Sequence, residues 1–326
     1  MKAAVQQSEL WSDVPVLVTG GAGFIGGHLV RGLLEAGACV RVLDDGSSGA
    51  IETIPPAVRF FRASVEDAAA VAEAVDGVRA VFHLAAMVSV PACQAEPQRC
   101  HAVNVRGSEI VARAARDVGA AVTFASSCAV YGSASPPIVE SAPTKPKSAY
   151  AQSKLDAEAC IEHLAEEGLR STRLRLFNVI GPGQRSDTAY AAVGAAFARS
   201  MIEGAPLCIE GDGRQTRDFV PVDLVIDVML RLGLQPANST LNVGTGHPCD
   251  LIALIAMFEA ASGRDAEVVH VAARPGDIRH SWANIDRLRS LLSDDLWSSD
   301  RITLEPVIAS LLEQYSGSAD AKQICT

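Results

Sequence analysis

Residues 14–27 read Val-Pro-Val-Leu-Val-Thr-Gly-Gly-Ala-Gly-Phe-Ile-Gly-Gly, and this stretch decides the fold. Its first six residues are mostly apolar and β-branched, which predicts a buried parallel strand. The glycines predict a tight turn, and the spacing of residues 28–36 predicts a helix after it. A second predicted strand, residues 39–43, ends at Asp44. The chain therefore begins with a strand, a glycine-rich turn, a helix and a strand that ends in an acid.

This unit is typical of a dinucleotide-binding site. Glycine at positions 20, 23 and 26 lets the backbone approach a pyrophosphate, whose negative charge meets the N-terminus of the following helix. The Asp44 carboxylate can accept hydrogen bonds from the hydroxyls of the adenosine ribose. The same carboxylate would repel a 2′-phosphate, and no Arg follows in the next few positions, so the sequence favours NAD over NADP.

Further strand-like and helix-like segments alternate along the chain. The predicted strands are residues 58–62, 80–84, 121–124 and 171–177, and the predicted helices are residues 65–75, 103–118 and 150–167. This alternation predicts an α/β fold, a Rossmann-type doubly wound parallel sheet with helices on both faces. Elements become shorter after Pro182, so we expect a NAD-binding domain at residues 14–180 and a smaller C-terminal substrate-binding lobe at residues 181–315, interleaved with the first.

The composition excludes several classes of protein. Of the 326 residues, 48% are hydrophobic and 20% are charged, as in an ordinary globular protein. The net charge of −10 argues against nucleic acid or an anionic membrane as a partner, because phosphate groups favour basic surfaces. The eight Cys residues form no C-x-x-C pair or Cys/His cluster, so we expect no metal site and a reducing compartment. No signal peptide or membrane-spanning run is recognisable, which predicts a cytoplasmic protein.

Tyr150 and Lys154 stand four residues apart at the start of a predicted helix whose N-cap is Ser148. This spacing puts both side chains on one helix face. An ammonium beside a phenol favours the phenolate, so we expect Lys154 to lower the pKa of Tyr150 towards the working pH of a general base. Ser127 follows the predicted strand 121–124, where ligands of parallel sheets bind, so its hydroxyl should face the same crevice.

A series of motifs runs from about residue 14 to about residue 293. In chain order they are Thr19-Gly20-Gly21-Ala22-Gly23-Phe24-Ile25-Gly26, His83-Leu84-Ala85-Ala86, Asn104-Val105-Arg106-Gly107, Ser126-Ser127-Cys128-Ala129-Val130-Tyr131-Gly132, Tyr150-Ala151-Gln152-Ser153-Lys154, Phe177-Asn178-Val179-Ile180-Gly181-Pro182, Gly211-Asp212-Gly213, Arg217-Asp218-Phe219 and Arg274-Pro275-Gly276-Asp277. Together they resemble the extended short-chain dehydrogenase/reductases that act on nucleotide sugars, of the UDP-glucose 4-epimerase type.

The resemblance implies roles at the cofactor. Tyr150 matches the family's catalytic base, Ser127 its catalytic Ser/Thr, and Lys154 the residue that lowers the Tyr pKa and binds the nicotinamide ribose. The residues that it places around NAD are Gly20, Gly23, Phe24, Ile25, Gly26, Asp44, Asp45, Ser64, Val65, Leu84, Ala85, Ala86, Asn104, Tyr150, Lys154 and Phe177. Ser64 stands where many relatives have an Asp that contacts the adenine, so we expect that contact to be weaker.

The resemblance also implies a nucleotide-sugar site. Arg217 and Arg274 match positions that hold the diphosphate, for which guanidinium groups are suited, and Cys208 and Glu210 match positions near the uracil. The full set of implied substrate residues is Ser127, Cys128, Asn178, Arg185, Ala192, Val193, Cys208, Glu210, Arg217, Arg274, Asp277 and Ser281.

The reaction that the resemblance implies is NAD-dependent epimerisation at C4 of a UDP-hexose through a transient 4-keto intermediate, the work of an isomerase. The small Ser281 is compatible with a UDP-N-acetylhexosamine as substrate. A UDP-uronate stays an alternative substrate, because Arg185 could bind its carboxylate. A homodimer is implied as well, through the helices that begin near residues 103 and 150.

Two alternatives stay open. One is a lyase, an NDP-sugar dehydratase that uses Cys128 as its acid, although Cys128 and Ala129 stand where the related dehydratases have Asp and Glu. A packed small side chain is the simpler interpretation of Cys128. The other is a non-catalytic dinucleotide-binding sensor, against which the intact set of Ser127, Tyr150 and Lys154 argues.

Overall fold

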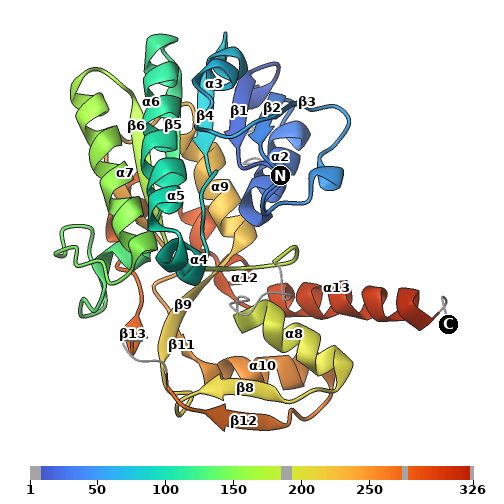
Figure 1. Ribbon diagram of the computed structural model, residues 1–326. Coiled ribbons are helices and arrows are strands. Elements are labelled where there is room, and N and C mark those ends of the chain that lie inside the picture. The colour runs from blue at the N-terminus through green and yellow to red at the C-terminus, as the bar shows by residue number, and fades with distance from the viewer. Residues whose placement is uncertain (1–8, 185–192, 274–277, 324–326) are drawn as a thin grey trace.

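A parallel sheet of seven strands forms the larger part of the protein (Figure 1). The computed structural model describes residues 9–184, 193–273 and 278–323, with side-chain environments to residue 316. In the order in which they pair, the strands are β10 (Thr240–Val243), β6 (Ser171–Leu176), β5 (Ala121–Ser127), β4 (Ala80–His83), β1 (Pro15–Thr19), β2 (Cys39–Asp44) and β3 (Arg59–Arg62). Every neighbouring pair is parallel, which confirms the predicted Rossmann-type fold.

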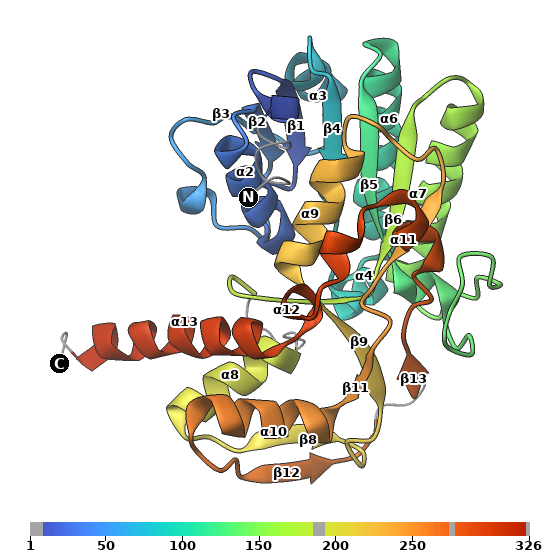
Figure 2. The same cartoon turned by 180° about the vertical axis from the view of Figure 1, so that it is seen from behind.

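Helices cover both faces of this sheet. Successive strand residues point to opposite faces, and Val16 and Val18 pack with α2 (Phe24–Glu35) and α9 (Val222–Leu232), whereas Leu17 packs on the other side. That other side carries α3 (Ala68–Val75), α6 (Gly107–Asp117) and α7 (Ala149–Glu166). Figure 1 shows α6 and α7 in front of the sheet, and Figure 2 brings α9 to the front.

The second lobe lies below the sheet in Figure 1 and has a core of its own. Its helices are α8 (Val193–Glu203), α10 (Leu251–Ser262) and α13 (Glu305–Gln323), and its two-stranded sheet pairs β8 (Leu207–Glu210) with β12 (Val268–Val271). A small sheet between the two parts contains β7 (Asn178–Ile180), β9 (Thr216–Pro221), β11 (Pro248–Asp250) and β13 (His280–Ser281). Short helical segments complete the chain: η1 (Ile51–Thr53), α4 (Val90–Ala95), α5 (Pro97–His101), the π-helical turn η2 (Ala102–Arg106), η3 (Cys128–Tyr131), α11 (Asp286–Leu291), η4 (Asp294–Trp297) and α12 (Ser299–Ile302).

Several element boundaries differ from the sequence prediction. Strand β5 continues past Phe124 to Ser127, because its last three residues pair with β6 despite their small and polar side chains. Helix α2 begins at Phe24, inside the glycine-rich stretch. The predicted cap of α7 is confirmed, since the Ser148 hydroxyl accepts a hydrogen bond from the Ala151 N–H at 3.1 Å.

The seventh strand was not predicted. Strand β10 and helix α9 follow residue 180 in the sequence but pack with the large sheet. The division into residues 14–180 and 181–315 stays a prediction. None of the helices formed by the described residues combines the length and hydropathy that crossing a bilayer requires.

The buried carboxylate of Asp218, on β9, joins the two parts of the protein. One of its oxygens accepts hydrogen bonds from the Thr245 N–H at 2.8 Å and the Thr245 hydroxyl at 2.6 Å. The other accepts from the N–H groups of Gly246 at 3.0 Å and Ala283 at 3.1 Å. A Cβ on Gly244 would lie 2.5 Å from this carboxylate, which explains the glycine at that position. The segments after β10 and β13 are therefore fixed to β9 by one side chain.

We predict that Asp218→Asn lowers the free energy of unfolding by about 2–3 kcal/mol, because an amide nitrogen would face backbone donors inside the protein. Equilibrium unfolding in urea measures the change. Asp117→Asn is the matched control, since that side chain is 66% exposed and its replacement should change stability by less than about 0.5 kcal/mol. Equal stability of the two variants would contradict the role of Asp218.

Candidate active site

The glycine-rich turn after β1 leaves a concave backbone surface without side chains. Gly20 has a φ of +72°, and a Cβ there would lie 2.6 Å from the Ala85 nitrogen in the segment that follows β4. A Cβ on Gly26 would collide with the Gly20 carbonyl oxygen. Only glycine fits at both positions, so the backbone is open to a ligand at the N-terminus of α2. Such a cradle suits a pyrophosphate.

The acid at the end of β2 lies directly beside this turn. The Asp44 carboxylate accepts hydrogen bonds from the Ala22 N–H at 3.0 Å and the Gly46 N–H at 2.9 Å. Each carboxylate oxygen keeps a further lone pair, so both can still accept from ribose hydroxyls. Asp45 is exposed and caps the following turn through the Ser47 N–H. These observations fit a dinucleotide.

Ser127 and Tyr150 meet at the carboxyl end of β5. Ser127 is the last residue of the strand, and its hydroxyl also accepts a hydrogen bond from the Ala129 N–H at 3.2 Å. Tyr150 lies in the first turn of α7. Burial raises the pKa of Tyr150 to about 12, while the nearby Ser127 side chain acts in the opposite direction and lowers the pKa. The structure thus brings together the hydroxyl and the phenol that the sequence singled out.

The pKa of Tyr150 is raised by burial, not lowered as expected from the nearby Lys154. The Lys154 ammonium donates to the Ala125 carbonyl at 2.8 Å and lies 4.9 Å from the centre of the Phe124 ring. Burial lowers the pKa of Lys154 to about 8, and the negative charge of Glu158 partly offsets this effect. The difference arises because the ammonium is directed at a strand carbonyl, and burial then dominates at the phenol.

His83, at the end of β4, links the elements around the active site through hydrogen bonds. Ser108 donates its hydroxyl proton to the Asn104 carbonyl at 2.6 Å, so at 2.8 Å it accepts from Nε2–H of His83. The Nδ1 atom of His83 then accepts from the Thr19 hydroxyl at 2.7 Å, and Thr19 in turn accepts from the Ala85 N–H at 3.3 Å. Burial lowers the pKa of His83 to about 3, with a smaller contribution from the charge of Lys154. A neutral imidazole therefore connects β1, β4 and α6.

Asn104 fixes the segment after β4. It lies in the π-helical turn η2, a feature that often marks functional sites. Its side-chain amide accepts from the Met87 N–H at 2.7 Å and donates to the Met87 carbonyl at 3.0 Å and the Ser153 hydroxyl at 2.9 Å. The segment from Leu84 to Ala86 is therefore fixed at one end by β4 and at the other end by the hydrogen bonds of Met87.

A buried ion pair was missed by the sequence analysis. Glu158 lies one turn beyond Lys154 on α7, and its carboxylate binds the Arg175 guanidinium of β6, with the shortest contact at 2.6 Å. Glu158 also accepts a hydrogen bond from Ser126, the residue before Ser127. The spacing of Tyr150, Lys154 and Glu158 was a usable signal, because three polar residues four apart occupy one helix face.

On the substrate side, the structure brings three predicted residues together. Cys128 begins η3, and its thiol lies near the Ser281 side chain on β13, which acts to lower the pKa of the thiol. Burial and the negative charge of Asp218 raise the pKa of Cys128 to about 12. Arg217 lies on β9 in register with Ser281 and acts to lower that pKa. Asn178 begins β7, beside β9.

The remaining predicted residues that the structure describes lie on other elements or in other segments. Cys208 and Glu210 lie on β8 in the second lobe, and Val193 begins α8. Ser64 bonds to the Glu66 N–H, Val65 is buried, and Phe177 follows β6. Arg185, Ala192, Arg274 and Asp277 lie outside the described residues. In the part of the chain that the structure describes, no cluster of three or more His, Cys, Asp or Glu is placed to hold a metal ion.

Comparison with known proteins agrees with this geometry. Residues 16–244 match the model of the NAD dependent epimerase/dehydratase family. The chain belongs to this family. A UDP-glucose 4-epimerase of Azospirillum brasilense is 33% identical over 94% of this chain and 95% of its own length.

Solved structures of family members are also similar. A UDP-N-acetylglucosamine 4-epimerase from Methanobrevibacter ruminantium, solved with UDP-N-acetylmuramic acid, is 32% identical, with a TM-score of 0.89 over 94% of this chain and 99% of that one. A Thermus thermophilus UDP-glucose 4-epimerase, solved with NAD, is 32% identical, with a TM-score of 0.84 over 94% and 100% of the two chains. The protein therefore uses NAD as its cofactor, and its glycine-rich turn and Asp44 fit this dinucleotide.

We predict that the free energy of unfolding decreases as the pH is lowered below about 6.5, and that His83 causes this decrease. In the unfolded chain this imidazole takes up a proton near pH 6.5, but in the folded protein only near pH 3, so between these values the unfolded state binds more protons. The expected loss is on the order of 1 kcal/mol for each pH unit. Urea unfolding at pH 7, 6 and 5 measures it.

His83→Gln should flatten this dependence between pH 7 and 5. His163→Gln is the control, because that side chain is 65% exposed and the slope should stay as in the unchanged protein. An unchanged slope in His83→Gln would show that another group is responsible.

Proposed function

We propose that the protein is a UDP-sugar 4-epimerase, an isomerase that inverts C4 of a UDP-hexose through a transient 4-keto sugar. The observation that supports this most strongly is the meeting of Ser127 and Tyr150 at the end of β5, at the same edge of the parallel sheet as the cradle formed by Gly20 and Gly26. The names of the similar proteins support the same activity, since both solved relatives above and the Azospirillum brasilense protein are 4-epimerases.

In this proposal, Ser127 and Tyr150 bind the C4 hydroxyl of the sugar and transfer its proton. The Ser127 hydroxyl binds and orients the C4 oxygen, and the Tyr150 phenolate takes the C4 hydroxyl proton and later returns it. The turn at Gly20 and Gly26 and the Asp44 carboxylate would hold NAD, which would supply reversible hydride transfer. Lys154 is a cation below about pH 8. In this proposal its charge stabilises the phenolate as it forms, and its ammonium holds a ribose hydroxyl.

The substrate residues are proposed on the same basis. Arg217 holds the diphosphate with Arg274, while Cys208 and Glu210 contact the uracil. Ser281 is small, which is compatible with an N-acetyl group on the sugar. A uronic acid would need a cation, for which Arg185 is the candidate. The homodimer through α6 and α7 and the cytoplasmic location stay predictions.

A dehydratase is the second candidate, because the family description includes that activity. It would need Cys128 to give or take a proton. The pKa of this thiol is raised to about 12 and the thiol lies near the Ser281 side chain, so Cys128 is a weak acid in a packed position. Both observations favour the epimerase.

Tyr150→Phe should lower turnover by about 10²–10⁴-fold, because the general base is lost. Epimerisation is measured by incubating the protein with UDP-, dTDP- and GDP-sugars and following C4 configuration by NMR. Bound NAD should be retained, since the cradle is unchanged. Tyr315→Phe is the matched control, because that phenol bonds the Gln184 carbonyl instead. Near-normal epimerisation by Tyr150→Phe would rule out the assignment.

Cys128→Ser separates the two reactions. An epimerase should keep most of its activity and give a product of unchanged mass. A dehydratase should be strongly impaired, and its normal product should have lost one water, which mass spectrometry detects. Loss of water from any sugar in the panel, abolished by Cys128→Ser, would replace the epimerase proposal by the lyase.

A further inference from the structure

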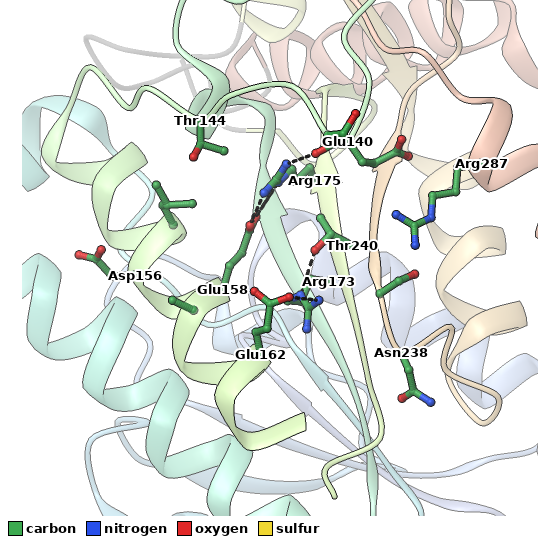
Figure 3. Close-up of a pocket in the computed structure, with 14 residues that line it drawn as sticks. Glu140, Thr144, Asp156, Glu158, Glu162, Arg173, Arg175, Asn238, Thr240 and Arg287 are labelled. Carbon is green, nitrogen blue, oxygen red and sulfur yellow. Dashed lines mark hydrogen bonds and ion pairs between the residues drawn. The ribbon is translucent and has the colours of Figure 1, made fainter. Parts of the chain in front are cut away.

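A cavity of about 600 Å³ lies at the edge of the large sheet (Figure 3). Its floor is formed by β6 and the edge strand β10, and its walls by α7, α11 and the loop that contains Glu140. Its volume is within the range of small-molecule sites in proteins. The cavity does not contain Ser127, Tyr150 or the glycine-rich turn, so it is distinct from the proposed active site.

Two guanidinium groups line this cavity from different elements. Arg173 lies on β6 and is only 4% exposed, while Arg287 reaches in from α11 on the other side (Figure 3). Burial lowers the pKa of Arg173, the negative charges of Glu162 and Glu158 raise it, and the positive charges of Arg175 and Arg287 lower it. Like charges so placed repel, which an anion between them would relieve.

The neutralisation of these two groups by protein residues is incomplete. Arg173 donates to the Thr240 hydroxyl at 2.9 Å and pairs at 3.2 Å with Glu162, whose side chain is 65% exposed. Exposed partners of this kind contribute little. Arg287 makes no side-chain hydrogen bond or ion pair with any described residue. Positive charge at this end of the cavity is therefore available to a ligand.

The four carboxylates that line the cavity all have partners, and for two of them the partner is an arginine of the cavity itself. Glu158 is paired with Arg175, the Glu140 carboxylate accepts from the Asn242 N–H at 2.9 Å, and Asp156 accepts from Gln152 at 2.8 Å. Hydroxyl and amide side chains line the rest of the cavity, among them Ser141, Thr144, Asn238 and Ser239. Groups of this kind hydrogen-bond the hydroxyls of a sugar.

We propose that this cavity is a second ligand site, which binds the phosphate or carboxylate group of a small hydroxylated metabolite between Arg173 and Arg287. Guanidinium groups bind both oxyanions through paired hydrogen bonds. The hydroxylated part of the ligand lies against Asn238, Ser239 and Thr240. The site would share a wall with the catalytic residues, because Glu158 and Arg175 line it and Glu158 bonds Ser126.

Calorimetric titration of the full-length protein at low salt tests this proposal without turnover, and so independently of the proposed function. The probes are glucose 1-phosphate, glucuronate and neutral glucose. We expect one or both anions to bind and glucose not to bind, and the preferred anion shows whether the group is a phosphate or a carboxylate. Arg287→Ala should weaken binding about 10-fold, the effect of losing one charge-assisted partner.

Two further variants place the ligand. Arg289→Ala removes a charge from the same helix, at a side chain that lies 5.9 Å from the Trp297 ring centre and outside the cavity, and should bind as the unchanged protein does. Arg217→Ala should also bind normally, because Arg217 belongs to the proposed active site. Absence of anion binding, equal affinity in Arg287→Ala, or loss of binding in Arg217→Ala instead would overturn the proposal.

Discussion

The close approach of two backbone segments, at the carboxyl ends of β1 and β4, is the constraint on which the active site depends. Gly20 leaves no room for a Cβ beside Ala85, so the glycine-rich turn and the segment after β4 lie against each other. The Thr19 hydroxyl and the His83 ring hold the same two strands together through hydrogen bonds. The surface on which a pyrophosphate can lie is therefore created by the absence of a side chain and stabilised by a neutral imidazole.

Buried charge is the second constraint, and it fixes the position of α7. Lys154 and Glu158 are buried one turn apart on this helix, and Arg175 meets Glu158 from β6. An isolated buried charge is costly, so each of these groups needs its partner. Rotation or sliding of α7 would break the Lys154 contact with Ala125 and the Glu158 contacts with Arg175 and Ser126 together. The orientation of the Tyr150 phenol towards Ser127 is thus a result of charge pairing elsewhere on the helix.

Features with a local signal could be predicted from the sequence. The glycine-rich turn, the acid at Asp44 and the Ser148 cap each depend on residues close together in the chain. Features that depend on distant partners could not. Strand β10 has no distinctive pattern and is defined by its neighbour β6, and the pairing of β5 with β6 extends β5 to Ser127. The direction of the Lys154 ammonium is set by the Ala125 carbonyl, which helix spacing alone does not reveal.

The position of β10 in the sequence has a consequence for synthesis. β6 ends at Leu176, but its outer neighbour begins only at Thr240, after α8 and α9 have been made. Chains are built from the N-terminus, so one edge of β6 has no strand to pair with until the ribosome has added residues 240–243. Unpaired strand edges attract other chains and chaperones. A nascent molecule of this protein is thus most exposed to wrong partners along β6, where the finished protein pairs residues 173–176 with β10.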